Sequence, residues 1–234
     1  MPGGNLSIVI PTLDAANLLP GCLGALGEAR HGGLLREIVI ADAGGCAESV
    51  EIAHGFGASV FVAPPGRGPQ LIAGAARSSG DWLLFLHADT CLESGWSREV
   101  KAFIAGPGAA ETAAAFRLRL DDAAPAARRI ERLADWRSRR LALPYGDQGL
   151  LISRRLYDRL GGYRPLPLME DVDLVRRLVR LGGRRHLCLL RSAAVTSAAR
   201  YRRDGWWMRP ARNLALLSLW YLGLPPAWLV RLYG

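Results

Sequence analysis

Lysine is almost absent from this sequence of 234 residues: Lys101 is the only one, and arginine supplies the rest of the basic excess. The formal net charge is +9, which suits a phosphate-rich ligand or an anionic membrane surface. A GC-rich coding sequence, which favours arginine, alanine and glycine, explains the same excess without any partner. The chain lacks an RNP motif, a zinc-finger spacing and a basic stripe with interleaved aromatic residues, so we expect no nucleic-acid partner.

Cysteine is also scarce. The four cysteines, Cys22, Cys46, Cys91 and Cys188, include no pair close enough in sequence for a CxxC motif. We expect no signal peptide, because an apolar run typical of a strand begins almost at once. We therefore expect reduced thiols in a cytoplasmic protein.

The C-terminal region lacks an uninterrupted apolar run long enough to cross a bilayer. Residues 213–230 are strongly apolar, but Pro225 and Pro226 leave only about a dozen residues before them. Two interpretations remain open. The segment is either an interior helix packed on the core or a helix at a membrane surface, where its neighbouring tryptophans and arginines would meet the headgroups. The second would place the protein at the inner face of the membrane.

Hydrophobic residues make up 50% of the chain, enough for a sizeable core. In the first half, short apolar runs alternate with segments of helical spacing. The predicted strands are 6–11, 36–42, 58–63 and 81–87, and the predicted helices are 15–29, 47–56 and 69–79. Strand and helix alternating at this rhythm predict right-handed crossovers and a mostly parallel sheet.

The second half has a different pattern. Residues 113–120 alternate apolar and basic side chains, as a half-exposed strand does. Residues 125–141 form an arginine-rich helix, residues 145–153 a polar turn that enters a strand, and residues 168–183 a helix with acids in its first turn. The fold class expected from both halves is α/β, in one continuous domain.

Polar residues follow the predicted strands, at the edge where parallel sheets bind ligands. Asp42 ends the second strand and would either cap the next helix or contact a ligand. The loop 64–69 carries glycines and Arg67, a combination that suits a phosphate. Asp89 follows the fourth strand, and a carboxylate buried there needs compensation that a magnesium or manganese ion bridging two phosphates would supply.

Glu170 and Asp171 begin a predicted helix. Acids at a helix start complement the helix dipole, which is a purely structural role. The functional alternative is a general base aimed at an acceptor hydroxyl. Both alternatives stay open from the residues alone.

Two further groups allow the same pair of interpretations. Asp147 and Gln148, in "YGDQG", either form a turn or hydrogen-bond a hydroxylated acceptor. Arg200, Arg202 and Arg203 either make a solvated face or reach a diphosphate. Each group is ordinary when taken singly.

The order of five stretches is more specific. The sequence resembles the family 2 glycosyltransferases in "LSIVIPTLD", "IVIADAGG", "PPGRGPQLIAGAARSSGDWLLFLHADT", "GDQGLLISRRLYDRLGGY" and "PLMEDVDLVRRL". Within that family it is similar to a compact bacterial subgroup with an "LFLHADT" signature. The resemblance runs from about residue 6 to the C-terminus. It implies a GT-A fold with a Rossmann-like central sheet flanked by helices, a nucleotide-sugar donor and a divalent metal, Mg or Mn.

The resemblance also implies roles for residues on the donor side. The family pattern places the ends of the first two strands beside the nucleoside, with residues Pro11, Thr12, Asp14 and Asp42. Arg67 and Gln70 would lie near the donor phosphates. Asp89 takes the place of the last acid of a metal-binding DxD motif, and His87 stands in the place of the first acid.

On the acceptor side, Asp171 of the Glu170–Asp171 pair matches the base of inverting members. The base would deprotonate an acceptor hydroxyl, which attacks the anomeric carbon opposite the leaving nucleoside diphosphate. Arg200 or Arg202 would stabilise the charge that forms on that diphosphate. A lipid-linked acceptor would account for peripheral membrane contact through the C-terminal helices.

The chain departs from the family pattern on the nucleoside side. The usual Asn-Glu after the first strand is Asp14-Ala15 here, so the glutamate is absent. The usual Gly-Ser-x-Asp-x-Thr is Gly44 to Ser49, which lacks the serine and the second aspartate, although Glu48 lies beside the vacated acid position. These changes bear on which base is bound and on the level of activity.

The implied function is therefore an inverting glycosyltransferase with one domain over 1–234. Its parts would be a nucleotide-sugar-binding half (about 1–110), an acceptor and catalytic half (about 111–200) and C-terminal helices (about 201–234). One alternative is a sugar nucleotidyltransferase, although "PTLDAANLLP" is not the glycine-rich loop such enzymes carry. Another is a non-catalytic protein that binds a membrane or a partner through its C-terminal third.

Overall fold

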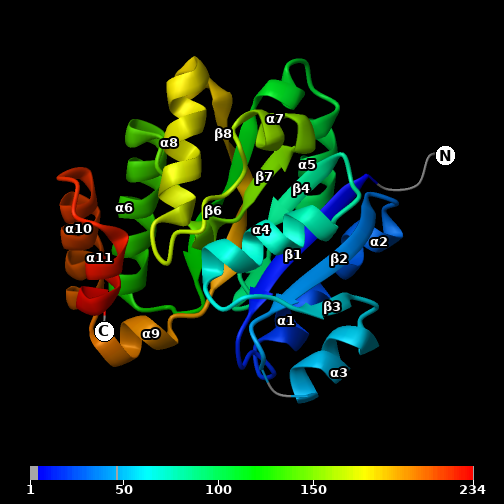
Figure 1. The fold of residues 1–234 in the computed structure, drawn as a ribbon, viewed down its shortest axis with the longest axis horizontal. Helices are drawn as coiled ribbons and strands as arrows, with labels where there is room; N and C mark the ends of the chain where they lie inside the picture. Colours follow the sequence, from blue (N-terminus) through cyan, green and yellow to red (C-terminus); the bar gives the residue numbers. More distant parts are fainter. Residues whose placement is uncertain (1–4, 46, 234) are drawn as a thin grey trace.

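The structure is a computed structural model that describes residues 5–45 and 47–233. Cys46, one of the predicted reduced thiols, lies outside the described residues. Within them the chain forms one eight-stranded sheet in the order β3-β2-β1-β4-β7-β6-β8-β5, with helices on both faces (Figure 1). The predicted α/β class is confirmed.

The strands and helices have the following bounds. The strands are β1 (Leu6–Thr12), β2 (Leu35–Asp42), β3 (Ser59–Val62), β4 (Trp82–Phe85), β5 (Thr90–Leu92), β6 (Ala113–Leu120), β7 (Leu150–Ser153) and β8 (Leu187–Thr196). The helices are α1 (Leu19–Ala25), α2 (Gly27–His31), α3 (Ala47–Gly55), α4 (Arg67–Arg77), α5 (Trp96–Ile104), α6 (Pro125–Leu141), α7 (Arg154–Arg159), α8 (Glu170–Gly182), α9 (Ala199–Asp204), α10 (Met208–Tyr221) and α11 (Pro226–Tyr233). Three short 3-10 turns complete the described chain: η1 (Ala109–Glu111), η2 (Gly146–Gln148) and η3 (Arg184–His186).

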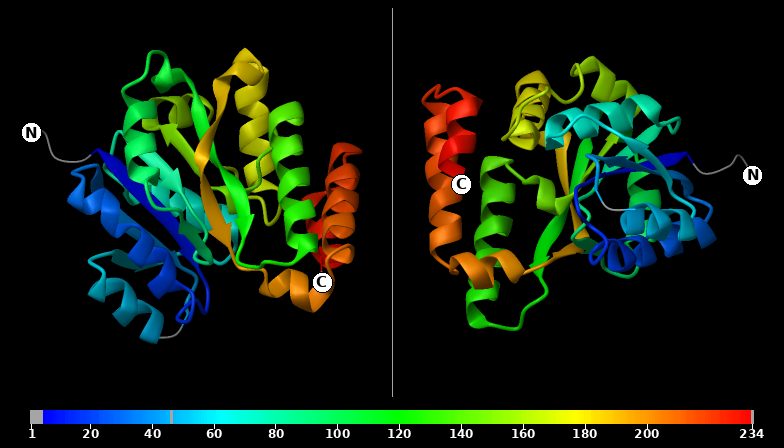
Figure 2. Two further views of the ribbon diagram at one scale, coloured as in Figure 1. Left: turned by 180° about the vertical axis from the view of Figure 1, so that it is seen from behind. Right: turned by 60° about the horizontal axis from the view of Figure 1, so that its bottom comes forward.

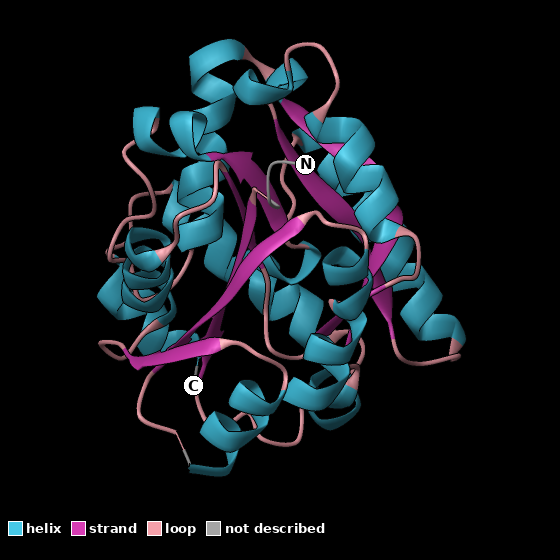
Figure 3. Ribbon diagram, turned by 90° about the vertical axis from the view of Figure 1, so that its right-hand side faces the viewer, coloured by secondary structure: helices cyan, strands magenta, loops and turns pink. Residues whose placement is uncertain are grey.

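The first half of the chain builds the parallel part of the sheet. β1 pairs in parallel with both β2 and β4, and β2 pairs in parallel with β3. The crossovers bring the carboxyl ends of these strands to one edge, as the sequence predicts. In the second half, β7 runs antiparallel to β4 and β6, while β6 and β8 are parallel and β5 is antiparallel to β8. Figure 3 shows these strands twisting past one another between the helices.

Alternation along the strands divides the core between the two faces of the sheet. Ile8 and Ile10 of β1 pack with α1 and α5 on one face, and Val9 between them packs with α4, α7 and α8 on the other. Figure 1 looks at the face with α4 and α8, and the left view of Figure 2 looks at the face with α1 and α5. Burial on both faces explains why β1 is almost continuously apolar.

Several predicted boundaries are wrong. The helix predicted at 15–29 begins only at Leu19 and divides at Leu26 into α1 and α2. The helix predicted from residue 69 begins at Arg67, so this arginine belongs to the first turn of α4 and not to the loop before it. β5, α5, α7, β8 and α9 were not predicted.

The C-terminal apolar segment packs on the rest of the protein through one face only. α10 buries Leu216 and Leu217, but Leu214, Tyr221 and Leu222 are exposed. Figures 1 and 2 place α10 and α11 beyond α6, far from the parallel part of the sheet. Among the described residues, no helix is long and apolar enough to span a bilayer.

Candidate active site

The turn after β4 carries Asp89 and is held by hydrogen bonds at Thr90. Thr90 N–H donates to the carbonyl of His87 at 3.2 Å, and the hydroxyls of Thr90 and Thr196 lie 2.9 Å apart. This second contact joins β5 to β8, whose register pairs the same two threonines. Although the turn is well held, Asp89 Oδ1 is buried and has no hydrogen-bond partner among the described residues.

Asp147 reaches the same place from η2. The Thr196 hydroxyl lies 3.3 Å from the carbonyl oxygen of Asp147, to which it donates. Asp147 Oδ1 is likewise buried, and no group in the described part of the chain hydrogen-bonds it. Burial raises the pKa of Asp147, and the nearby charge of Arg137 opposes that rise. Asp89 and Asp147 line one cavity of about 110 Å³.

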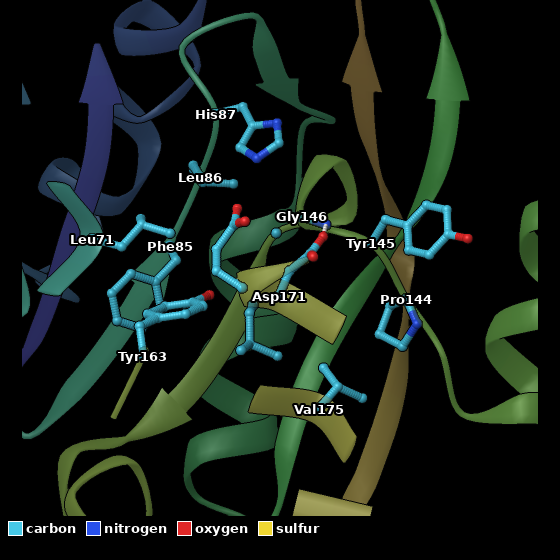
Figure 4. A pocket seen from close by; sticks show the side chains of 13 residues that line it. Leu71, Phe85, Leu86, His87, Pro144, Tyr145, Gly146, Tyr163, Asp171 and Val175 are labelled. Carbon is cyan, nitrogen blue, oxygen red and sulfur yellow. Dashed lines mark hydrogen bonds between the residues drawn. The ribbon is translucent and has the colours of Figure 1, made fainter. Parts of the chain in front are cut away.

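Asp171 lines the same cavity from the first turn of α8. Its Oδ2 accepts a hydrogen bond from Gly146 N–H at 2.6 Å, and its Oδ1 accepts one from Val172 N–H at 2.7 Å. Both contacts orient the carboxylate without neutralising it. Figure 4 shows Asp171 pointing toward Gly146 at the edge of a smaller neighbouring cavity of about 20 Å³.

Glu170 lies behind Asp171 and does not reach the larger cavity. Its side chain is 1% exposed and pairs with Arg67, with 3.4 Å between Arg67 Nη1 and Glu170 Oε1. Burial and the charge of Asp171 raise the pKa of Glu170 to about 7, while Arg67 opposes the rise. Glu170 therefore holds Arg67 against the start of α8 instead of facing the larger cavity.

His87 stands between the two cavities and lines both. Burial, together with the charges of Arg67 and Arg200, holds the pKa of His87 well below its usual range, so the imidazole is neutral near pH 7. Because Gly146 has no side chain, the His87 ring fits beside it. A Cβ at position 146 would lie 2.7 Å from His87 Nε2 and 3.3 Å from Asp171 Oδ2.

Arginines supply positive charge to the larger cavity. Arg67, Arg200 and Arg209 line it, from α4, α9 and α10 respectively. Arg202, the predicted alternative to Arg200, turns away and pairs with the carboxylates of Asp121 and Asp122. The cavity thus combines carboxylates from three segments with guanidinium groups from three helices.

The strand ends predicted to border a nucleoside form a separate hydrogen-bonded group. Thr12 Oγ1 donates to Asp42 Oδ1 at 2.7 Å, and the N–H groups of Gly44 and Gly45 donate to Asp42 Oδ2. Gln70 Nε2 lies 2.7 Å from the carbonyl oxygens of both Thr12 and Ala41. Its amide therefore braces β1 against β2, and its predicted contact with a phosphate stays a prediction.

Pro11 and Asp14 lie at the same edge of the sheet. Pro11 is half-buried within β1, and Asp14 is exposed with a left-handed φ of 49°. Aspartate tolerates that conformation better than most residues do. Their predicted place beside the nucleoside also stays a prediction.

Gln148 is occupied within the protein. Its Oε1 accepts hydrogen bonds from Arg137 Nη2 and Ser138 Oγ, both at 3.0 Å, and its Nε2 donates to the carbonyl of Phe116 at 2.9 Å. The side chain is buried and fixes η2, which carries Asp147. Its predicted contact with an acceptor is untested by this arrangement.

The structure therefore brings part of the predicted set together in one cavity. The predicted residues that line the larger cavity are Arg67, His87, Asp89, Asp147, Asp171 and Arg200. Sequence reasoning missed other lining residues, among them Tyr145, Thr196, Tyr201, Arg209 and Asn213. Tyr145 had a local signal in "YGDQG", and Thr196 and Tyr201 stand in "TSAARYRRDGWW", a stretch that shares the family resemblance; Arg209 and Asn213 come from a segment with no motif of its own.

Asp89 and Asp147 are candidate ligands for a divalent cation, with His87 lining the same cavity. Each has a buried carboxylate oxygen with no hydrogen-bond partner among the described residues, and a bound cation would satisfy both oxygens. Among the described residues, no group of three or more His, Cys, Asp or Glu side chains is placed to hold a metal ion. Magnesium sites generally use one or two carboxylates together with phosphates and water, so the two carboxylates match the protein's share of such a site.

Comparison with known proteins supports this picture. A family model described as Glycosyl transferase family 2 matches residues 7–162. A PGL/p-HBAD biosynthesis glycosyltransferase of Mycobacterium bovis is 34% identical over a stretch covering 42% of this chain and 41% of that protein. A protein of the same name from Mycobacterium tuberculosis matches equally. The matched region thus spans less than half the length of these curated relatives.

Solved structures show the same fold at low sequence identity. A mannosyltransferase from Pyrobaculum calidifontis, in complex with GDP-Man and Mn²⁺, has a TM-score of 0.67 at 15% identity over 91% of this chain and 62% of that one. Glucosyl-3-phosphoglycerate synthase from Mycobacterium tuberculosis, with Mg²⁺ and UDP, has a TM-score of 0.62 at 19% identity over 83% and 70%. The narrower subgroup suggested by "LFLHADT" stays a prediction. With a GT-A fold and a family match over two thirds of its 234 residues, the chain belongs to glycosyl transferase family 2.

Proposed function

We propose that the protein transfers a glycosyl group from a nucleoside-diphosphate sugar to an acceptor hydroxyl, with inversion at the anomeric carbon. One observation carries the proposal: Asp171 faces the same cavity as the buried, unpartnered oxygens of Asp89 and Asp147. A general base and a cation site would then face one substrate in the same cavity. The nucleotides in the solved relatives support a donor of this class.

Asp171 is the proposed base. The hydrogen bonds from Gly146 and Val172 fix its carboxylate, so the remaining lone pairs can receive the acceptor proton. The acceptor oxygen forms its bond to the anomeric carbon as the bond from that carbon to the diphosphate oxygen breaks. The proton passes to Asp171, and the electron pair leaves with the nucleoside diphosphate.

The proposed cation ligands are Asp89 and, beside it, Asp147. A bound Mg²⁺ or Mn²⁺ would neutralise charge on the leaving diphosphate. Arg67 and Arg200 face the same cavity and would bind the phosphate oxygens directly. Because His87 is neutral near pH 7, its ring can orient a hydroxyl or a water without adding charge.

The donor nucleoside is proposed to lie along the ends of β1 and β2. Asp42 holds Gly44 and Gly45 through its carboxylate, which shapes the edge that such a ligand would meet. Pro11, Thr12 and Asp14 would border the same ligand, with Gln70 bracing the two strands beneath it. The base of the nucleotide is left open by these contacts.

A donor screen tests the proposal. The purified protein is incubated with a panel of nucleotide-sugars and Mn²⁺, and release of nucleoside diphosphate is measured. We expect one donor to be consumed, and Asp171→Asn to lower kcat by about 10²–10⁴-fold while nucleotide binding persists. Asp158→Asn, at an exposed position on α7, is the matched control.

Thermal unfolding separates binding from chemistry. A nucleoside diphosphate with Mn²⁺ should raise the Tm, and Asp89→Ala should remove that rise. If Asp171→Asn left a verified transfer reaction intact, the mechanism would be wrong even with the family correct. Release of pyrophosphate from a nucleoside triphosphate and a sugar phosphate would instead support a sugar nucleotidyltransferase.

We propose in addition that the C-terminal helices contact an anionic membrane surface. Trp207, Met208, Leu222 and Trp228 are exposed on or beside α10 and α11. Arg202 and Arg203 lie exposed on the adjoining α9. Apolar rings beside guanidinium groups suit a headgroup region, and a lipid-linked acceptor would be reached from there.

A further inference from the structure

A large apolar groove runs between α6 and α10. Its volume is about 410 Å³, within the roughly 300–1,000 Å³ typical of small-molecule sites. Its walls include Ile130, Leu133, Leu143, Trp207, Leu214 and Leu217. Leu133 and Leu214, from the two facing helices, are 55% and 63% exposed. The groove is therefore an open apolar surface and not part of the closed core.

The groove adjoins the catalytic cavity. Tyr145, Asp147, Tyr201 and Asn213 line both spaces, so the two lie side by side. Tyr201 stacks on Trp206, with ring centroids 5.9 Å apart, and these rings extend the groove wall. A molecule with its hydroxyl at Asp171 would therefore have this groove beside it.

Charge decides which kind of molecule fits. The charged residues in the groove are Arg129, Arg137 and, at the end shared with the cavity, Asp147. Arg137 is held over the Tyr145 ring, 3.4 Å from its centroid, and is hydrogen-bonded to Gln148. Arg129 lies 5.9 Å from the centre of the Trp207 ring. The space between the helices thus presents aliphatic and aromatic surface, which a sugar or a phosphate would not match.

We propose that this groove binds the apolar part of the acceptor, so that the enzyme glycosylates an amphiphile with an alkyl or arylalkyl chain. The apolar chain of the acceptor lies between α6 and α10, and the hydroxyl end of the acceptor enters the cavity past Tyr145 and Tyr201. This inference rests on the proposed function, since it assigns a hydroxyl acceptor to the cavity. It differs from membrane contact, because the ligand is a single molecule enclosed by the groove.

The test uses straight-chain primary alcohols from hexanol to dodecanol, each kept below its aggregation limit. Binding to the full chain is measured by calorimetry, with Mn²⁺ and a nucleoside diphosphate present and no donor sugar. Because each buried CH₂ is worth about 0.8 kcal/mol, Kd should fall roughly fourfold per carbon until the groove is filled. Donor turnover plays no part in this readout, so its failure is distinct from failure of the proposed function.

Substitutions in the groove test where the alkyl chain of the alcohol binds. Leu133→Ser and Leu214→Ser together should abolish the dependence of Kd on chain length, and both positions are exposed enough for the fold to tolerate the change. Leu181→Ser, at a 49% exposed leucine of α8 outside the groove, is the control and should behave as wild type. The nucleotide-induced Tm rise should persist in every variant.

Four results would overturn the inference. Kd could be independent of chain length, or the control could lose as much affinity as the double variant. Analytical sedimentation could also show that the wild type is a dimer and the double variant a monomer. In that case a second copy of the protein covers the groove. Loss of alcohol binding with an intact nucleotide effect would reject the acceptor groove and leave the glycosyl-transfer proposal standing.

Discussion

Asp147 buries a carboxylate oxygen that no group of the described chain hydrogen-bonds. An unsatisfied buried polar atom costs about 1–3 kcal/mol, and more when it is charged. Without a ligand, Asp147→Asn should therefore raise the free energy of unfolding by about 1 kcal/mol, or the Tm by roughly 2–4 °C. With Mn²⁺ and a nucleoside diphosphate the order should reverse, because the wild type gains a ligand contact that the amide lacks. An equal ligand-induced rise in both proteins would exclude Asp147 from the cation site.

Glu170 predicts a pH dependence of stability. Its pKa is about 7 in the folded protein and near 4.5 in the unfolded chain. The stabilisation from its bound proton is therefore complete below about pH 4.5 and is lost as pH rises through 7. Because one pKa unit corresponds to about 1.4 kcal/mol, the loss approaches ~3 kcal/mol.

Glu170→Gln avoids this loss, since an amide does not ionise. Urea unfolding should show the variant gaining on the wild type by up to ~3 kcal/mol between about pH 5 and about pH 8. Glu51→Gln, at an exposed position on α3, controls for the substitution itself. A difference from wild type that stayed constant with pH would show that Glu170 is charged throughout.

The space at Gly146 predicts an effect of substitution on activity. Its missing side chain leaves space for His87 and Asp171, so Gly146→Ala must displace the imidazole. We expect kcat/KM to fall by about 10- to 100-fold, because misplacing a catalytic group by about 1 Å has effects of that size. Gly24→Ala in α1, where a Cβ meets nothing within 4 Å, is the control. Equal activity in the two variants would mean that the position of His87 is unimportant.

At the scale of elements, the start of α8 depends on α10. Leu217 packs with Leu143 and Val172, the residue after the proposed base. Leu217→Ala should lower the free energy of unfolding by about 2–3 kcal/mol and weaken transfer, since the cavity would loosen beside Asp171. Leu222→Ala, at the exposed end of α10, should change neither. If urea unfolding and kinetics gave the same values for both variants, α10 would not support the site.

How far the sequence predicts each element depends on whether its signal is local. β6 and α6 have the bounds expected from alternation and helical spacing, because each pattern is complete within its own segment. β5 has three residues and exists through its pairing with β8. A strand that short has no readable period, so its position could not be predicted from sequence. The start of α4 was predicted at residue 69 but lies at Arg67. Pro69 stands within the first turn of the helix, where proline is tolerated.

The candidate site follows the same rule. Asp89 and Asp171 could be predicted because each stands in a motif at the end or start of an element. Tyr201, Arg209 and Asn213 reach the cavity only because α9 and α10 fold back against α8. Such convergence is a tertiary effect, and no spacing in the sequence signals it. The same holds for the choice of Arg200 over Arg202, which Asp121 and Asp122 decide by pairing with the latter.

At the scale of the whole molecule, net charge and exposed aromatic rings would both contribute to the proposed membrane contact. A charge of +9 attracts the chain to any anionic surface, and salt weakens that attraction. Insertion of Trp207 and Trp228 into the membrane would add a contribution to binding that salt does not weaken. The two parts can be separated by varying salt and aromatic content independently.

Co-sedimentation with vesicles makes that separation. We expect the protein to pellet with anionic phosphatidylglycerol vesicles at about 0.02 M salt and only partly at about 0.5 M, and to stay in solution with neutral phosphatidylcholine vesicles. Trp207→Ser with Trp228→Ser should remove the salt-resistant part and leave the low-salt binding, because the arginines remain. Val62→Ser, at an exposed apolar position on β3, should change neither part. Full recovery in the supernatant at low salt would mean that the basic charge serves the phosphates of the donor and not a membrane.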